Sequence, residues 1–282
     1  MPRITTRNAR FQQWRALLDN RKKRNRQGEF LVQGVRPISL VVAAGWPIRA
    51  LVHTEERRLS AWAQNVLDEV SAPRFAMADD LLAELGEKAT EIPELVAVAA
   101  LPEDDLSRIP VSSGFCGVVF DRPTSPGNIG TLVRSADAFG ADGVIVTGHS
   151  ADAYDPKAVR ASTGSLFGIP VVRVPSHREV MEWVHRQRGA GTPIQVTGSD
   201  EQGTVEPAVA DLSEPVLLVV GNETVGLSAA WREVCDTMMR IPMAGTASSL
   251  NAASAATVVL YEMVRQRGGP PAQTGATQMV AP

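Results

Sequence analysis

IPMAGTASSLNAASAAT, residues 241–257, begins like a strand and ends like a helix rich in Ala, Ser, Asn and Thr. Between the two parts, residues 244–249 carry only Ala, Gly, Thr and Ser side chains. Such residues add little to a hydrophobic core, but they allow another backbone segment or a flat ligand to approach closely. Ser249 is also a candidate N-cap for the helix that follows. We therefore interpret this loop as a place where the main chain itself makes contacts.

Two earlier segments place polar residues directly after apolar strands. In FDRPTSPGNIGTLVRSADAFGADGVIV, residues 120–146, Asn128 follows a Pro/Gly-rich loop at the start of a helix, where it is a candidate N-cap. Arg134 lies six residues further on, in mid-helix, where an arginine often does no more than face solvent. In LLVVGNETVGLS, residues 217–228, an apolar strand leads into Glu223, and a carboxylate there usually has a function or a group to cap. These polar residues are candidates for one functional site.

The composition is that of a globular chain. Its 282 residues, 44% of them hydrophobic, are enough for one large domain or two modest ones. No run of about 18 apolar residues predicts a transmembrane helix, and the N-terminus lacks the apolar core of a secretory signal. Cys116 and Cys235 lie in apolar surroundings, which indicates reduced thiols rather than a disulfide framework. We therefore expect a cytoplasmic protein.

Several common kinds of site have no signature in the sequence. The glycine patterns of dinucleotide-binding folds and P-loops are missing, which disfavours a dinucleotide-dependent oxidoreductase. There is no Gly-x-Ser-x-Gly elbow of a hydrolase. The four histidines do not cluster and no metal-ligand spacing occurs, so no metal site is expected.

The charge is unevenly distributed. Residues 1–49 carry 11 Lys and Arg against 2 acidic residues, a net charge of +9, whereas the rest of the chain carries −12. A basic end on an acidic body indicates a polyanionic partner, although a merely solvated basic helix would have the same composition. Amides and the aromatics Phe11 and Trp14 are interleaved with the charges, which suits nucleic acid better than a membrane. The predicted RNA contacts are Arg7, Arg10, Arg21, Lys22, Lys23, Arg24 and Arg26.

The hydrophobic pattern predicts an α/β protein with two domains and a disordered tail. Residues 1–105 form the first domain, with a helix at 5–20 and a basic loop at 21–29. A linker rich in Pro, Ser and acidic residues marks the boundary near residue 105. In the second domain, residues 106–269, continuous apolar strands alternate with helices, as in a parallel sheet covered on both faces. Residues 270–282 are the tail. The helices of the second domain are expected at 128–139, 157–164, 176–188, 228–235 and 249–267.

Three motifs together resemble the SpoU/TrmH (SPOUT) family of RNA ribose 2′-O-methyltransferases. The first is Asn128 followed six residues later by Arg134. The second is Gly-x-Glu-x-x-Gly-Leu at 221–227, and the third combines Ile-Pro-Met and Ser-Leu-Asn within 241–251. They occur in the family's order and spacing, and the resemblance covers roughly residues 115–267.

The N-terminal part resembles the L30e-like substrate-binding domain of the same family. GEFLVQGVRPISLVVAAG follows that pattern, although Gln33 stands where Glu is usual. Within the family, RNARFQQW and DRPTSPGNIG are most similar to the avilamycin-resistance type of 23S rRNA methyltransferase. The implied activity is methyl transfer from S-adenosylmethionine to a ribose 2′-hydroxyl of 23S rRNA, giving resistance to a ribosome-targeting antibiotic. The alternatives are a non-catalytic RNA-binding protein and a tRNA 2′-O-methyltransferase of the same fold.

The resemblance also implies a knotted fold and a set of site residues. In this family the C-terminal segment passes through a loop to form a trefoil knot, so residues 241–257 would be slim in order to be threaded. The cofactor would lie in the knot, and the protein would form a homodimer through its C-terminal domain. The implied catalytic residues are Arg134, Asn128, Glu223, Ser249 and Asn251. The implied cofactor contacts are Gly221, Asn222, Ile241, Pro242, Leu250, Thr197 and Gly198.

The roles expected for these residues follow from their chemistry. A guanidinium has a pKa above about 12 and stays protonated in proteins, so Arg134 is expected to hold a phosphate and stabilise charge at the 2′-oxygen rather than act as a base. Asn128 would position the ribose or Arg134, and Glu223 would orient Arg134 or its loop. For the dimer, the helix SLNAASAATVVLYEMVRQ, residues 249–266, offers Leu250, Ala253, Ala256, Thr257, Leu260 and Val264 near helical spacing.

Overall fold

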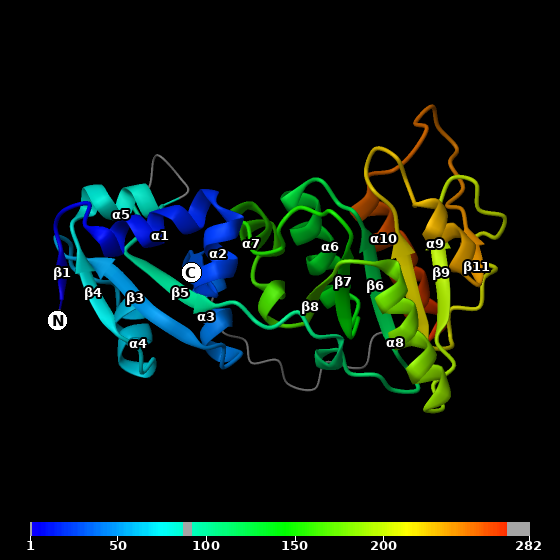
Figure 1. The fold of residues 1–282 in the computed structure, drawn as a ribbon, viewed down its shortest axis with the longest axis horizontal. Coiled ribbons are helices and arrows are strands. Elements are labelled where there is room, and N and C mark those ends of the chain that lie inside the picture. Colours follow the sequence, from blue (N-terminus) through cyan, green and yellow to red (C-terminus); the bar gives the residue numbers. More distant parts are fainter. Residues whose placement is uncertain (1, 87–91, 270–282) are drawn as a thin grey trace.

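The computed structural model describes residues 2–86 and 92–269, which form two α/β units along one long axis (Figure 1). The N-terminal unit is built on a five-stranded sheet in the order β1-β4-β3-β5-β2. Its β5 runs antiparallel to both β3 and β2, whereas β1, β4 and β3 are parallel. Its strands are β1 (Arg3–Ile4), β2 (Glu29–Gln33), β3 (Ile48–Thr54), β4 (Arg74–Met77) and β5 (Leu95–Ala100). Its helices are α1 (Ala9–Asp19), α2 (Arg21–Gln27), α3 (Val35–Ala43), α4 (Ala61–Glu69) and α5 (Asp79–Leu85).

The predicted basic loop at 21–29 is wrong, because residues 21–27 form the helix α2. The side chain of Asn20 caps its start by accepting a hydrogen bond from the Lys23 N–H, and Gly28 ends it in the left-handed region at φ 65°. Lys, Arg and Gln are good helix formers. No apolar periodicity marks this short helix, because its buried residue is Arg24 rather than an apolar side chain.

The C-terminal unit contains a fully parallel six-stranded sheet, as predicted from its continuous apolar strands. The strand order is β11-β9-β10-β6-β7-β8. Helices α6, α7 and α10 share a core with one face, while α8 and α9 pack on the other. The strands are β6 (Cys116–Asp121), β7 (Gly143–Thr147), β8 (Val171–Val174), β9 (Gln195–Ser199), β10 (Val216–Val220) and β11 (Thr237–Met239). The helices are α6 (Pro126–Ala138), α7 (Pro156–Ser162), α8 (His177–Gly189), α9 (Ala229–Val234) and α10 (Ala252–Gln266), and short 3₁₀ turns occupy Leu106–Arg108 and Ser165–Phe167.

The strand order places a switch point between β6 and β10. From β6 the chain proceeds through β7 to β8, and it then returns to the opposite side of β6 through β9 and β10. In open parallel sheets, ligands bind at the carboxyl ends of the strands next to such a point. The loops after β6, β9, β10 and β11 are therefore the ones placed to form a site.

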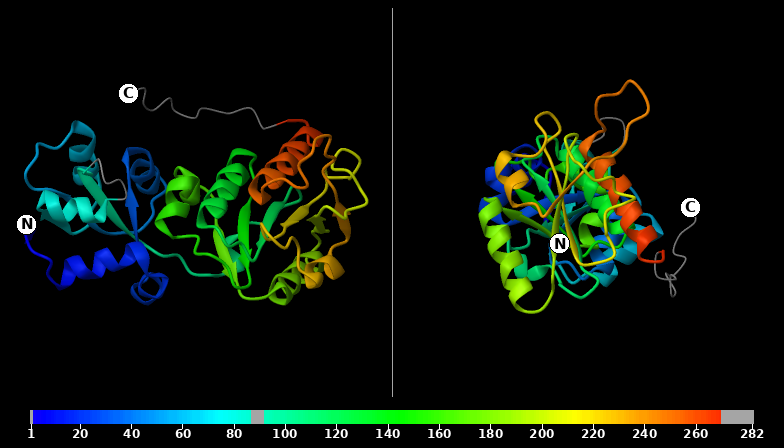
Figure 2. Two further views of the ribbon diagram at one scale, coloured as in Figure 1. Left: turned by 90° about the horizontal axis from the view of Figure 1, so that it is seen from above. Right: turned by 90° about the vertical axis from the view of Figure 1, so that its right-hand side faces the viewer.

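The two units follow one another along the molecule (Figure 2). They pack through a seam of aromatic and charged side chains. Phe30 of β2 lies with its ring centroid 4.9 Å from that of Tyr154, and Trp46 lies 5.3 Å from Phe167. Arg24 of α2, 2% exposed, forms an ion pair of 2.8 Å with Asp152. The predicted boundary near residue 105 falls between β5 and β6, and the predicted tail, residues 270–282, lies outside the described residues.

The small-residue loop is open to solvent. Residues 242–251 are all exposed, and the loop stands out from the body of the molecule (Figure 1, orange). Gly245 has no atom within 4 Å of the position that a Cβ would take. The close backbone approach lies instead at Gly221, where a Cβ would come within 2.3 Å of Leu227 N. The knot itself stays a prediction.

Three further expectations about α6 and α10 need correction. The N-cap of α6 is Ser125, with Asn128 two residues inside the helix, and the N-cap of α10 is Asn251 rather than Ser249. Along α10, the residues expected to contact a second subunit include Ala253, Ala256 and Leu260, which are buried within the unit itself. The exposed apolar residues of this helix are Val258 and Tyr261, at 42% and 58%.

Candidate active site

A cavity of about 510 Å³ lies at the carboxyl ends of β9, β10 and β11. Its walls come from the strand ends and loops of residues 199–201, 220–226, 240–243 and 248–250, with Arg232 from α9 and two alanines of α10. The loops converge here because parallel strands end at the same edge of the sheet. Five of the predicted cofactor residues line this cavity: Gly221, Asn222, Ile241, Pro242 and Leu250.

Thr197 and Gly198 are not among the lining residues. Both belong to β9, and Thr197 is 1% exposed, so its side chain is covered by protein. The cavity begins with Ser199, Asp200 and Glu201, where the strand ends. The structure therefore places Ser199, Asp200 and Glu201, rather than Thr197 and Gly198, in the cavity wall. The rule that ligands bind at the carboxyl ends of parallel strands, applied to β9, would have pointed to these three residues.

Asp200 and Arg232 form an ion pair in the cavity wall. The Asp200 side chain is 3% exposed, and its Oδ2 lies 2.8 Å from Nη2 of Arg232. The other carboxylate oxygen accepts a hydrogen bond from the Gln202 N–H. No motif in the sequence marks either residue, because each becomes part of the site only when β9 and α9 are brought together by the sheet.

Glu223 ties the loop after β10 to the loop after β6. Its Oε2 accepts hydrogen bonds from the N–H of Thr124 at 3.0 Å and from the hydroxyl of the same residue at 3.1 Å. Its Oε1 accepts from the Ser125 N–H at 3.2 Å and from Nδ2 of Asn128 at 2.9 Å. Of the two roles expected for Glu223, the structure favours orienting the loop, because no contact with Arg134 is found in the described part of the chain.

These hydrogen bonds determine the ionisation of Glu223. Burial alone would raise the pKa of this carboxyl group, but the donors of Thr124, Asn128 and Ser125 outweigh that cost, and the pKa lies below its usual value. Glu223 is therefore a carboxylate near neutral pH. A carboxylate that is fully engaged as an acceptor acts here as a structural anchor for Asn128.

Asn251 completes the link between the three motifs. Its Nδ2 donates to Oδ1 of Asn128 at 3.2 Å, while its own Oδ1 caps α10 by accepting from the Ala253 N–H at 3.0 Å. The structure thus joins Glu223, Asn128 and Asn251 in one chain of hydrogen bonds. Ser249 lies two residues before Asn251, exposed, and lines the cavity.

Arg134 stands apart from this network. It is exposed on α6, and it is not among the residues that line the cavity. Within residues 2–86 and 92–269, no hydrogen bond or ion pair of its guanidinium is found. The next residue, Ser135, contacts α10 through a 2.7 Å hydrogen bond with Thr257. The Arg134 guanidinium is therefore open to contact with another molecule.

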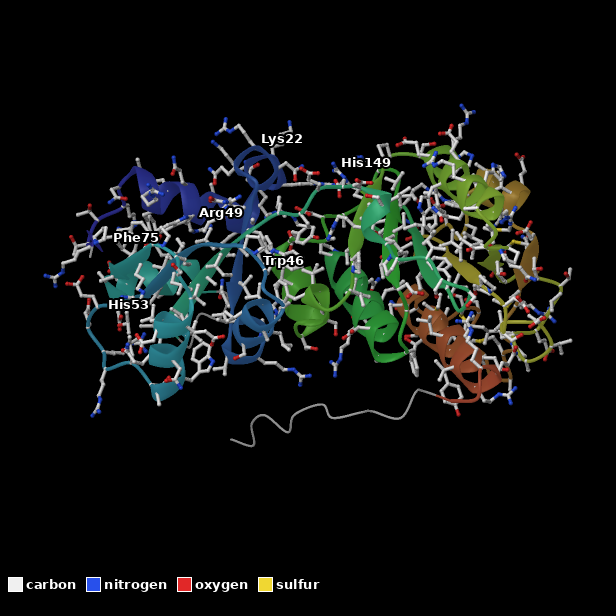
Figure 3. The ribbon with its side chains drawn as sticks, turned by 90° about the horizontal axis from the view of Figure 1, so that it is seen from below. Lys22, Trp46, Arg49, His53, Phe75 and His149 are labelled. Atoms are coloured by element: carbon white, nitrogen blue, oxygen red, sulfur yellow. The ribbon has the colours of Figure 1, made fainter. Side chains whose placement is uncertain are left out.

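The residues predicted to contact RNA differ in their surroundings. Arg24 is buried and ion-paired with Asp152 and Asp155, so its prediction as an RNA contact is corrected. Phe11 and Trp14 are 1% and 2% exposed in the core of the N-terminal unit, and they do not offer a stacking surface. Arg7 pairs with Glu84, Arg10 lies over the ring of Trp14, and Arg21 donates to the Ser150 carbonyl. Lys22 and Arg26 are exposed and Lys23 is half-buried; Lys22 projects from the outer side of α2 (Figure 3).

Neither a metal cluster nor a membrane span occurs in the described residues. Among them, no group of three or more His, Cys, Asp or Glu side chains is placed to hold a metal ion. None of their helices has the length and apolar character needed to cross a bilayer. Cys116 is buried and Cys235 half-buried, both as free thiols, and burial raises the pKa of each to about 12.

Comparison with known proteins gives matches over nearly the whole chain. Residues 8–97 match the SpoU L30e-like domain, and residues 116–261 match the SpoU rRNA Methylase family. The chain is 63% identical over 265 residues to a 23S rRNA (uridine(2479)-2′-O)-methyltransferase of Streptomyces viridochromogenes, covering 94% of this chain and 92% of that protein. It is 29% identical over 260 residues to the 23S rRNA (guanosine(2553)-2′-O)-methyltransferase RlmP of Bacillus subtilis, covering 92% and 97%.

Solved structures give the same result. The crystal structure of the SpoU methyltransferase AviRb from Streptomyces viridochromogenes, in complex with the cofactor AdoMet, matches with a TM-score of 0.90 and 62% identity, over 94% of this chain and all of that one (100%). An AdoMet-bound rRNA methyltransferase from Sinorhizobium meliloti matches with a TM-score of 0.81 and 29% identity, over 93% and 97%. The similarity therefore extends through both units.

Proposed function

The chain belongs to the SpoU rRNA methylase family, and on that basis we propose that it transfers a methyl group from S-adenosylmethionine to a ribose 2′-hydroxyl of 23S rRNA. The observation that carries the proposal is the hydrogen-bonded chain Glu223–Asn128–Asn251 beside the cavity at the ends of β9, β10 and β11. It joins all three family motifs at one edge of the sheet. The relative that is 63% identical over nearly its whole length is named for this reaction.

The cavity fits the cofactor in size and in the nature of its walls. Its volume of about 510 Å³ lies within the range of roughly 300–1,000 Å³ that is common for small-molecule sites. Much of the wall is main chain from residues 221–226 and 240–243, and Gly221 leaves no room for a Cβ. When bound, S-adenosylmethionine would supply an electrophilic methyl group on a sulfonium. Gly221, Ile241 and Leu250 would hold it chiefly through backbone groups.

The protein's part in the reaction is to position the ribose and to stabilise charge. Because Nδ2 of Asn128 donates to Glu223 and its Oδ1 accepts from Asn251, its amide is fixed in one orientation beside the cavity. We assign it the placement of the ribose. Arg134, exposed on α6, would hold a neighbouring phosphate through its planar guanidinium and stabilise negative charge at the 2′-oxygen.

The proposal includes the RNA partner and its consequence. The exposed cations of α2, Lys22 and Arg26, would meet the phosphate backbone beside the seam between the two units, where α2 lies (Figure 1). A 2′-O-methyl group placed within a drug site on the ribosome would obstruct a ribosome-targeting antibiotic, so we include resistance in the proposal. Ribosomal RNA as the substrate would place the protein in the cytoplasm.

The proposal also includes a homodimer formed through the C-terminal unit. Val258 and Tyr261 lie one turn apart on the outer side of α10, at 42% and 58% exposure, and Met243 and Leu250 are each 39% exposed in the neighbouring loop. A two-fold contact is the commonest way to cover such a surface. Arg134, exposed on the neighbouring helix α6, would then lie near the seam between subunits.

The test is methylation of defined RNA with isotopically labelled S-adenosylmethionine. Purified 23S rRNA, 50S particles and tRNA are offered separately, and modified riboses are mapped by primer extension at limiting nucleotide. Label in 23S rRNA or in the particle, at a single ribose, is the expected result. Label in tRNA alone would identify a tRNA methyltransferase. Tight RNA binding without label in any substrate would identify a non-catalytic RNA-binding protein.

A further inference from the structure

Arg122, in the loop between β6 and α6, has an unusual backbone conformation. Its φ of 52° lies in the left-handed region, and Thr163 is the one other non-glycine residue there in the described part of the chain. For residues other than Gly, Asn and Asp, the left-handed conformation costs free energy. Such a conformation persists where the surrounding contacts impose it. The contacts of Arg122 therefore indicate what the conformation achieves.

Both the backbone and the side chain of Arg122 hold the loop after β10. The Arg122 carbonyl accepts a hydrogen bond of 2.6 Å from Nδ2 of Asn222, and the Nη2 of its guanidinium donates to the Gly226 carbonyl at 3.3 Å. Asn222 and Gly226 are themselves joined by two backbone hydrogen bonds, each 3.0 Å. Arg122 thus contacts both ends of the closed turn 222–226.

Asp121 anchors this arrangement from within the sheet. Its side chain is 4% exposed, and its Oδ2 accepts from Nε of Arg122 at 3.1 Å. The same carboxylate accepts from the Ser228 N–H at 3.1 Å and from the Thr147 hydroxyl at 3.2 Å. The Arg122 N–H donates to the Thr147 carbonyl, which fixes Arg122 to the end of β7 as well.

The turn held in this way forms one wall of the cavity. All residues from Gly221 to Gly226 line it, and Glu223 in the same turn anchors Asn128. We propose that Arg122, supported by Asp121, is a positioning residue that keeps the 221–226 turn in the form that binds S-adenosylmethionine. This inference rests on the proposed function, because it assigns the cofactor to this cavity.

Arg122→Asn separates positioning from folding. Asn tolerates the left-handed region better than other non-glycine residues, and the backbone carbonyl that accepts from Asn222 is kept, so the fold is retained while the guanidinium is removed. We expect the dissociation constant for S-adenosylmethionine, measured by calorimetry, to rise about tenfold, which corresponds to the removal of one charge-assisted hydrogen bond. The KM for the cofactor rises in parallel, whereas the KM for RNA changes little. The thermal midpoint falls modestly, because Asp121 loses its ion-pair partner but keeps its hydrogen bonds from Ser228 and Thr147.

Two further variants serve as rescue and control. Arg122→Lys keeps a cationic donor on a flexible stem and restores part of the cofactor affinity. Arg186→Asn removes an exposed arginine of the last turn of α8, at the opposite edge of the sheet from the turn, and leaves cofactor affinity at the wild-type value. Wild-type cofactor binding and RNA methylation are measured in the same series, so that failure of the proposed function is seen in the wild type itself.

Two results would overturn the assignment. One is an Arg122→Asn protein that binds S-adenosylmethionine as tightly as the wild type. The other is a variant whose weaker cofactor binding is matched by equally weakened RNA binding and a large fall in the thermal midpoint, which would make Arg122 a residue of general stability. A selective rise in the cofactor constants supports the proposal.

Discussion

Nδ2 of Asn128 lies 2.9 Å from Oε1 of Glu223, across 95 residues of sequence. The contact joins the start of α6 to the turn after β10, at the point where the chain changes direction in the sheet. It means that the residue assigned to the ribose and the wall of the cofactor cavity cannot move independently.

Replacing Glu223 with Gln should therefore damage catalysis more than folding. The amide keeps the shape of the side chain, but it lacks the charge that attracts the N–H groups of Thr124 and Ser125 and it offers only one acceptor oxygen. We expect kcat to fall by about 100-fold, the scale associated with a misplaced reacting group. Single-turnover methylation measures it, with Glu214→Gln as a matched control; an unchanged kcat would contradict the anchor role.

The pH dependence of stability should carry the signature of the same carboxylate. The pKa of Glu223 is lower in the folded protein than its ordinary value, so the folded state binds a proton less readily than the unfolded chain. The stabilisation that ionised Glu223 adds to the free energy of unfolding is therefore complete above the unfolded pKa of about 4.3. This stabilisation disappears as the pH falls through the folded pKa. Denaturant unfolding of wild type and Glu223→Gln should differ at pH 7 and converge in the acid range. If the difference in free energy of unfolding between the two proteins grew on acidification, the pKa of Glu223 would not be lowered by folding, and this explanation would be excluded.

Arg134→Ala should abolish methyl transfer while cofactor binding changes little. The guanidinium is exposed on α6 and does not line the cavity, so it is placed to meet RNA rather than the cofactor. Lys at this position should fail to rescue activity, because it lacks the planar fork that binds phosphate through two bonds. Cofactor titration and single-turnover assays on both variants decide the point, and near-normal turnover of Arg134→Ala would refute the assignment.

The basic residues of α2 should separate into two classes. Lys22→Ala and Arg26→Ala remove exposed charges. The slope of the logarithm of the RNA-binding constant against the logarithm of salt concentration should become less steep by about 0.7–0.9 for each phosphate contact that is lost. Arg24→Met instead leaves Asp152 and Asp155 without their partner, and it should destabilise the protein by about 3–5 kcal/mol. Filter binding at several salt concentrations and urea unfolding distinguish the two effects. A flattened salt slope with full stability in Arg24→Met would show that the ion pair is not structural.

Features whose cause is local could be predicted from the sequence, and features that depend on distant segments could not. Continuous apolar strands predicted the parallel sheet, since burial on both faces leaves that pattern directly in the sequence. Asn128, Glu223 and Asn251 could be found through motifs, but the hydrogen bonds between them arise only when three distant loops meet at one sheet edge. The prediction for Arg24 was wrong for the same reason, because its hydrogen-bond partner Asp152 lies 128 residues away.

The exposed face of α10 can be used to test the proposed homodimer. Val258 and Tyr261 expose apolar surface in the middle of α10, at 42% and 58%, whereas Ala253, Ala256 and Leu260 on the other side of the helix are buried in the core of the unit itself. An isologous dimer would place Val258 near its own two-fold mate, so Val258→Asp would bring two charges together in a desolvated contact.

We therefore expect wild-type protein to sediment as a dimer and Val258→Asp protein as a monomer with reduced methylation. Val35→Asp is the matched control, because Val35 is 52% exposed and lies at the start of α3 in the N-terminal unit; it should remain dimeric and active. Loss of activity in the monomer would place part of the site, with Arg134 the leading candidate, across the subunit contact.

A second experiment then mixes the Arg134→Ala protein with a Val220→Phe protein, in which the larger side chain reduces the volume of the cavity. Recovery of activity in mixed dimers would show that each site draws on both subunits, whereas a fully active wild-type monomer would contradict the dimer itself.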